Sequence, residues 1–195
     1  IITIDTDEGL EIMRHTLTAQ VLASAVKNLF PDAKLAIGPT IENGFYYDFL
    51  LASPLSPEDL NKIEEEMKKI ISTGSNISKA YKNKKEATKL FEDKSEKYKV
   101  DIINDSEQND NFQIYQQENT DFIDLCRGPH LPSLKHIGAF KLTKISGAYW
   151  KGDSKNEMLQ RIYGTAWPNE KKLNKYLLML EEAEKRDHRK LGKEM

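Results

Sequence analysis

The side chains best suited to chemistry lie in one short stretch, DLCRGPH, at positions 124 to 130. It contains the only cysteine of the chain, Cys126, with Asp124 and Arg127 beside it and His130 four positions later. The Gly-Pro pair between the thiol and the imidazole disfavours helical geometry, so we expect both side chains on a bend. A lone cysteine is often a buried apolar side chain. This density of functional groups in a loop nevertheless favours a functional site.

The composition is that of a soluble globular protein, because 38% of the 195 residues are hydrophobic and 31% are charged. A chain of this length can form one large domain or two small lobes around a core. No apolar run approaches the ~18 residues of a membrane span, and no segment resembles a secretory leader. A single cysteine cannot form an internal disulfide, which favours the reducing cytoplasm. Since the chain begins at Ile1 and ends in a charged helical pattern, we expect a piece of a longer protein.

Charge is distributed unevenly along the chain, although the net charge is only −2. Residues 101–124 contain seven acidic and no basic residues, whereas residues 127–161 contain seven lysines and arginines and two acidic residues. A local basic stretch of this kind could bind phosphates. Solvated lysines on exposed strands explain it equally well.

The elements that would position these groups begin with a helix. Residues 12–30 carry apolar side chains at three-to-four spacing and precede a proline, which is typical of a helix that faces a core. His15, Thr16 and Gln20 lie on or near its first turns. An Asn-Gly pair at 43–44 stands between two apolar runs and predicts a β-hairpin.

The rest of the pattern alternates helices and strands. A Ser-Pro-Glu cap predicts a second helix over residues 57–73, and the lysine-rich residues 79–99 predict a short helix with loops. Residues 139–150 and 158–167 read as strands joined by a polar turn, and a last helix begins after Asn169. This order predicts an α+β fold with antiparallel sheet.

Several long blocks carry a resemblance to a known family: LFPDAKLAIGPTIENGFYYDF, FIDLCRGPH, FKLTKISGAYWKGDSKNEMLQRIYGTAW and EEAEKRDHRKLGKEM. In that order they resemble the editing domain of bacterial-type threonyl-tRNA synthetases and the helix that leads into their catalytic core. The likeness covers nearly the whole chain from about Met13. It implies antiparallel sheets and packed helices around a cleft, of the threonyl/alanyl-tRNA synthetase second-additional-domain type. The implied parts are an editing domain, residues 1–168, in one or two lobes, and a linker helix, residues 169–195.

The resemblance implies hydrolysis of mischarged seryl-tRNA(Thr). Serine lacks one methyl group of threonine, and such a difference gives only ~1–3 kcal/mol of discrimination in one pocket. A second pocket that admits serine and excludes threonine can remove the error. Hydrolysis of the aminoacyl ester requires an activated water and a stabilised oxyanion.

The resemblance also implies the site residues. His130 would position or deprotonate the water, Lys99 would face the ribose or the developing negative charge, and Asp124 would bind the substrate ammonium. Cys126 would line the pocket or orient the water, since its ordinary pKa of ~8.5 leaves it mostly as a thiol. Tyr47 on the hairpin is implied as a substrate-binding residue.

The first helix departs from the family pattern of histidine-x-x-x-histidine. An ungapped alignment puts Thr16 and Gln20 at the two histidine positions and turns His15 away from the cleft. A one-residue insertion, absorbed by a helical bulge, would instead bring His15 into the cleft. We favour the ungapped register and treat all three residues as substrate-binding candidates. The ungapped register predicts that hydrolysis is weakened, because the two imidazoles of the family pattern are missing.

No metal is expected, because Cys126 and His130 have no certain third ligand. No cofactor is expected in these residues either, since the resemblance assigns ATP, magnesium and zinc to the synthetase's catalytic core. The expected partners are the 3′ acceptor end of tRNA(Thr), seryl-tRNA and the remainder of the synthetase chain, with no membrane. The alternative to hydrolysis is a catalytically inactive module that binds the tRNA acceptor end and acts as a spacer.

Overall fold

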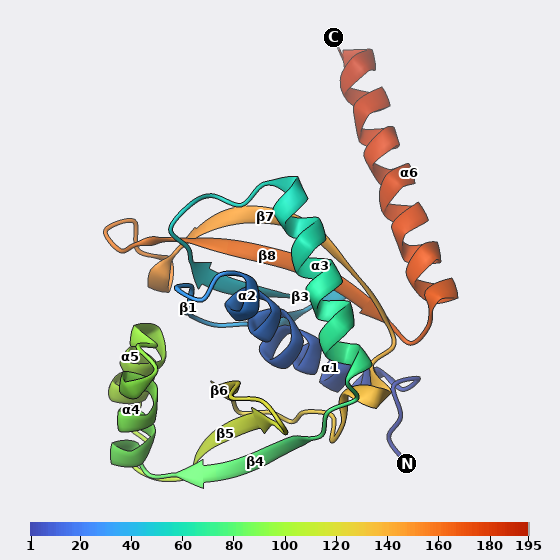
Figure 1. Cartoon of the computed structure of the whole chain (residues 1–195). Helices are drawn as coiled ribbons and strands as arrows, with labels where there is room; N and C mark the ends of the chain where they lie inside the picture. The colour runs from blue at the N-terminus through green and yellow to red at the C-terminus, as the bar shows by residue number, and fades with distance from the viewer. Residues whose placement is uncertain (195) are drawn as a thin grey trace.

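The larger of two antiparallel sheets has five strands, with β3 and β8 at its centre, in the computed structural model, which describes residues 1–194 and side chains through Arg189 (Figure 1). The strands are β1 (Lys34–Leu35), β2 (Thr40–Ile41), β3 (Gly44–Leu50), β7 (Ala139–Tyr149) and β8 (Met158–Trp167). β3 follows the predicted hairpin turn, at which Asn43 has a φ of +64°. On β3, Phe45, Tyr47 and Phe49 are fully buried against the helices, whereas Tyr46 is half-buried.

Two helical segments cover the inner face of this sheet. The first is continuous and consists of α1 (Asp7–Thr16), a π-helical stretch η1 (Leu17–Leu22) and α2 (Ala23–Leu29). It begins five residues before the predicted start, because the Thr6 hydroxyl caps it by accepting a hydrogen bond from the Gly9 amide. The second, α3 (Pro57–Ser72), begins at the predicted Ser56 cap.

A smaller lobe is formed by a three-stranded antiparallel sheet and two short helices (Figure 1). Its elements are β4 (Ile77–Lys82), α4 (Lys84–Asp93), α5 (Lys97–Asp105), β5 (Phe112–Gln117) and β6 (Ile123–Leu125). The prediction of one short helix with loops over residues 79–99 was therefore wrong, and strands β5 and β6 were missed. The polar and acidic side chains of this region hide a core of only five fully or nearly buried apolar residues, Ala87, Phe91, Ile103, Phe112 and Ile114.

The last helix, α6 (Glu170–Glu194), projects from the body of the molecule (Figure 1). Asn169 caps it as predicted, since its side chain accepts a hydrogen bond from the Lys172 amide. Two single-turn 3₁₀ helices, η2 (Leu134–His136) and η3 (Trp150–Gly152), complete the chain. Among the described residues, no helix combines the length and apolar character needed to cross a bilayer.

Packed helices on antiparallel sheets confirm the predicted α+β class.

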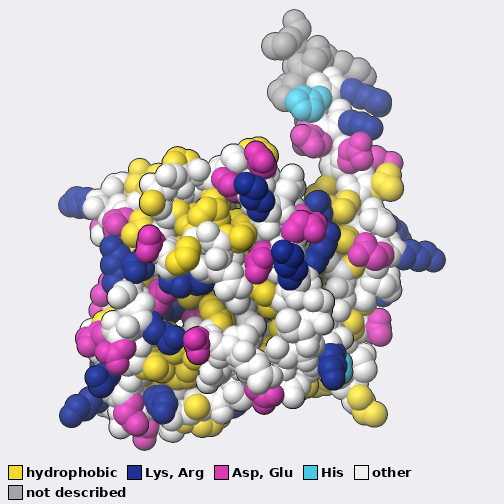
Figure 2. All heavy atoms as spheres, in the orientation of Figure 1, with side chains coloured by type: hydrophobic (Ala, Val, Ile, Leu, Met, Phe, Trp, Pro, Cys, Tyr) yellow, Lys and Arg dark blue, Asp and Glu magenta, His cyan; other side chains and the backbone are white. Residues whose placement is uncertain are grey.

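Charge is mixed on the face seen in Figure 2, where basic and acidic side chains alternate around small apolar patches. The basic stretch of the sequence, residues 127–161, extends from the loop after β6 through β7 into β8 of the larger sheet. No single basic surface dominates the face shown in Figure 2.

Candidate active site

The loop that follows β6 crosses from the smaller lobe to the first helix. The Cys126 amide donates to the Gln113 carbonyl of β5, which fixes the start of the loop, and the Leu131 amide donates to the Thr16 hydroxyl on the helix. Between them Gly128 has a φ of +65°, and a Cβ there would lie 2.0 Å from the Tyr115 hydroxyl oxygen. Only glycine fits this bend without displacing Tyr115.

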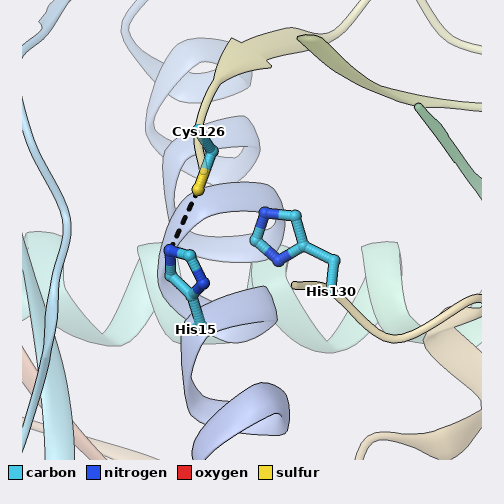
Figure 3. A group of neighbouring side chains, drawn as sticks. All are labelled: His15, Cys126 and His130. Carbon is cyan, nitrogen blue, oxygen red and sulfur yellow. Dashed lines mark hydrogen bonds between the residues drawn. The ribbon is translucent and has the colours of Figure 1, made fainter. Parts of the chain in front are cut away.

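Three side chains from two elements meet at this crossing (Figure 3). His15 reaches out from α1, and its Nε2 lies 2.9 Å from the Cys126 Sγ. The His130 ring lies 4.6 Å from the His15 ring, centroid to centroid. His15 is therefore the partner of Cys126 and His130 that the sequence left uncertain.

The π-helical stretch explains how His15 reaches the loop. A π turn holds one residue more than an α turn, so it absorbs an inserted residue without breaking the helix. The favoured ungapped register was therefore wrong for His15, which contacts Cys126 instead of pointing away. The bulged alternative describes the helix.

The other two helix candidates lie inside the protein. Thr16 is fully buried and contacts His130, with 3.2 Å between its Oγ1 and Nδ1. Gln20 is also fully buried, and its side-chain amide has no hydrogen-bond partner among the described residues. Ala19, one turn after His15, borders a cavity between the two lobes, whereas Thr16 and Gln20 do not.

Hydrogen bonds define the protonation of the His15 and Cys126 pair. His15 Nδ1 lies 3.3 Å from the Pro129 carbonyl, which can only accept, so Nδ1 carries the proton and Nε2 is an acceptor. Cys126 then donates its S–H to that nitrogen. Burial raises the pKa of Cys126 to about 11 and lowers the pKa of His15. The pair is therefore neutral near pH 7.

His130 is held in a drier position than His15. Burial, together with the neighbouring His15, lowers its pKa to about 3. The Tyr115 ring packs edge-on against it at 4.4 Å, and its Nε2 is buried without a hydrogen-bond partner among the described residues. His130 is consequently a neutral imidazole with one unused nitrogen.

A buried charged group lies beside this cluster. Lys99 Nζ is 2.9 Å from one Asp124 oxygen, and the Tyr47 hydroxyl donates to the other at 3.0 Å. Both charged side chains are at most 4% exposed. Burial raises the pKa of Asp124, while Lys99 and the hydrogen bonds to the carboxylate oppose that effect. Asp124 and Lys99, expected to contact different parts of a substrate, are thus paired with each other.

Both groups face a cavity of about 850 Å³ between the lobes. His15, Cys126, Lys99 and Asp124 border it, whereas His130 does not reach it. Its outer wall includes Trp150 and Lys151 at the turn between β7 and β8, as well as Ile37, Arg127 and residues of α5. No local sequence signal marks Trp150 or Lys151 as site residues, because they reach the cavity only through the pairing of two long strands.

The cluster brings together three possible metal donors. Cys126 Sγ and one nitrogen of each histidine lie within 4.8 Å of one another. The expectation of no metal rested on the lack of a third donor, and His15 removes that reason. Bound zinc requires a thiolate, however, and the raised pKa of Cys126 opposes its formation.

Residues 113–163, from β5 to β8 and including the Cys126 loop, match the family model described as "Threonyl and Alanyl tRNA synthetase second additional domain". The chain belongs to this family of synthetase domains.

Two of the similar proteins are threonine–tRNA ligases. A threonine–tRNA ligase from Prochlorococcus marinus (strain MIT 9211) is 51% identical over 195 residues, which is all of this chain and 30% of that protein. One from Paramagnetospirillum magneticum is 55% identical over 189 residues, or 96% of this chain and 29% of that protein. The chain spans about 30% of the length of these relatives and corresponds to the part of a threonyl-tRNA synthetase that carries the second additional domain.

Proposed function

We propose that this domain edits mischarged tRNA by hydrolysing the ester of seryl-tRNA(Thr). The observation that carries the proposal is a neutral imidazole, His15, at the wall of a cavity between two lobes, with its Nε2 unprotonated and in contact with the Cys126 thiol. A general base for ester hydrolysis must be unprotonated at the working pH and within reach of water. The lowered pKa of His15 satisfies the first condition, and its place at the cavity wall satisfies the second.

His15 takes the role of base in this proposal. The Cys126 S–H turns away from Nε2, which then accepts a proton from water while the oxygen attacks the ester carbonyl carbon. The tetrahedral oxyanion forms near the Lys99 ammonium, at the cavity wall. When the ester C–O bond breaks, the ribose oxygen takes the proton from His15. The products are serine and tRNA with a free 3′ end.

The cavity is suited to the end of a nucleic acid. Its volume of about 850 Å³ is within the ~300–1,000 Å³ range of small-ligand pockets, and it can hold a terminal nucleoside with one small amino acid. Arg127 and Lys151 at its rim offer positive charge to the adjoining phosphates. We further propose that the tRNA(Thr) acceptor end and the rest of the synthetase chain are the partners, in the cytoplasm, where tRNA is charged.

The test is deacylation measured with radiolabelled seryl-tRNA(Thr) and threonyl-tRNA(Thr), each incubated with the 195-residue chain and with its His15→Ala variant. We expect release of serine by the unchanged chain, slower release of threonine, and loss of both with the variant. His136→Ala is the matched control, because His136 is an exposed histidine outside the cavity. Binding of the tRNA without release of serine would support the inactive acceptor-binding module instead.

A further inference from the structure

Thr16 makes an unusual set of contacts for a buried threonine. Its hydroxyl oxygen lies 2.9 Å from the Ile12 carbonyl of the same helix, 2.9 Å from the Leu131 amide and 3.2 Å from His130 Nδ1. The side chain is fully buried, so no solvent competes for these contacts. All three lie on the protein side of the site, away from the cavity.

Counting the donors and acceptors around the Thr16 hydroxyl leaves one arrangement of hydrogen bonds. A hydroxyl has a single hydrogen and two lone pairs. The Ile12 carbonyl can only accept, so it takes the hydrogen, and the Leu131 N–H fills one lone pair. His130 Nδ1 must then donate to the second lone pair.

We infer that Thr16 is a positioning residue that holds His130 in the tautomer protonated on Nδ1, so that Nε2 is an acceptor. In the opposite tautomer, Nδ1 would have to take the Thr16 hydrogen from Ile12. Nε2 is buried without a partner among the described residues in either tautomer, so it does not distinguish the two. The contact between the Thr16 hydroxyl and the Ile12 carbonyl therefore favours the assigned tautomer.

The acceptor has a use in the proposed reaction, and this part of the inference rests on the proposed function. Cys126 donates its S–H to His15 Nε2 at 2.9 Å, which occupies the nitrogen that must take a proton from water. The sulfur and one nitrogen of each ring lie within 4.8 Å of one another. With Nε2 of His130 unprotonated, the thiol can rotate its hydrogen toward His130 and leave His15 free. Thr16 thereby keeps the second imidazole ready to accept.

The test reads the tautomer directly. The 195-residue chain is labelled with ¹⁵N-histidine, and long-range ¹H–¹⁵N correlation spectra near pH 7 distinguish a protonated from a bare ring nitrogen. The His130 signals are assigned by their loss in His130→Gln. We expect Nδ1–H in the unchanged chain and in Thr16→Ser, which keeps the hydroxyl. Thr16→Val, which has the same shape without the hydroxyl, should give a mixture of tautomers or mainly Nε2–H.

Deacylation of seryl-tRNA(Thr) by the same proteins gives the second readout. For Thr16→Val we expect kcat to fall about fivefold with KM unchanged, the size expected for one lost hydrogen bond, and Thr16→Ser to restore it. An Nε2–H tautomer in the unchanged chain would overturn the inference even if Thr16→Val did not fold. An unaltered His130 tautomer in a folded Thr16→Val protein would do the same. The expected spectra without any deacylation would leave the positioning role intact and remove the proposed function.

Discussion

Two buried groups of polar side chains lie beside one cavity, and they differ in charge. Lys99, Asp124 and Tyr47 keep a full ion pair, in which both carboxylate oxygens have a partner. His15, Cys126 and His130 instead remain neutral, and one imidazole nitrogen has no partner among the described residues. Burial thus fixes charge in one group and leaves protons free to move in the other. The first is suited to anchoring a structure and stabilising charge, and the second to acid–base chemistry.

The largest expected effect comes from removing the imidazole at the cavity wall. His15→Ala should lower the deacylation rate of seryl-tRNA(Thr) by ~10²–10⁴-fold, the usual contribution of a positioned base. Its thermal stability should change little, because His15 contributes no buried charge. Rates and melting temperatures are measured on the same preparations, with His136→Ala as the control.

Full activity of the His15→Ala protein would contradict the assignment of the base. His130→Ala then decides between the two imidazoles. Loss of activity only in that variant would assign the role of base to His130, which the resemblance implied as the residue that positions or deprotonates the water.

A substitution in the charged group should lower the stability of the fold, whereas His15→Ala should leave it nearly unchanged. Lys99→Met keeps the length of the side chain and leaves the Asp124 carboxylate buried without its cation. Breaking a buried pair in this way costs ~3–5 kcal/mol of unfolding free energy. Urea unfolding measures the loss.

Lys151→Met is the matched control for that experiment. Its partner Asp105 and Lys151 itself are both more than half exposed. The loss for an exposed pair should stay within ~1 kcal/mol. Equal losses in the two variants would mean that burial does not distinguish the pairs.

The dependence on pH should separate the two groups further. Burial lowers the pKa of His130 to about 3 and also lowers that of His15, so both imidazoles take up a proton at a lower pH than an ordinary histidine. Any fall in the deacylation rate on acidification, corrected for spontaneous hydrolysis, should therefore be centred below the ordinary histidine pKa of ~6.5. A fall in rate centred near pH 6.5 would indicate an imidazole with an ordinary pKa.

The same pKa values set the sign of a stability effect. Unfolded histidines bind protons near pH 6.5 and the folded ones do not, so protonation favours the unfolded state as pH falls. The unfolding free energy should decrease from pH 7 toward pH 5. His130→Ala should reduce that slope.

The sequence predicted the elements that local signals define. The Asn-Gly turn, the Ser56 cap and the two long strands are each fixed by a few neighbouring residues, and each occurs where expected. The loop that presents Cys126 and His130 was predicted as a bend for the same reason. The resemblance supplied Lys99 and Tyr47, which no local signal selects, whereas Asp124 already stood out through its place in the DLCRGPH loop.

What the sequence could not predict depends on contacts between distant segments. The π-helical stretch from Leu17 to Leu22 has no distinct sequence signature, yet it decides whether His15 faces Cys126. The pairing of Lys99 with Asp124 depends on how α5 packs against β6. Strands β5 and β6 were missed because polar and acidic residues interrupt their apolar positions.

The smallest expected effect on the deacylation rate is that of substituting Cys126. Burial raises the pKa of Cys126 to about 11, so the sulfur is a thiol near pH 7 and a poor nucleophile. In the proposed mechanism its task is to donate a hydrogen to one imidazole or the other, which a hydroxyl also performs. Cys126→Ser should therefore keep the rate of seryl-tRNA(Thr) deacylation within about threefold, the scale of a weak hydrogen bond. Rates are compared under single-turnover conditions with and without a chelator, since a thiolate-bound metal would make the unchanged chain alone sensitive to it. Abolished activity, or a seryl-enzyme trapped by acid quench, would show that sulfur attacks the ester and would transfer the nucleophilic role from water to Cys126.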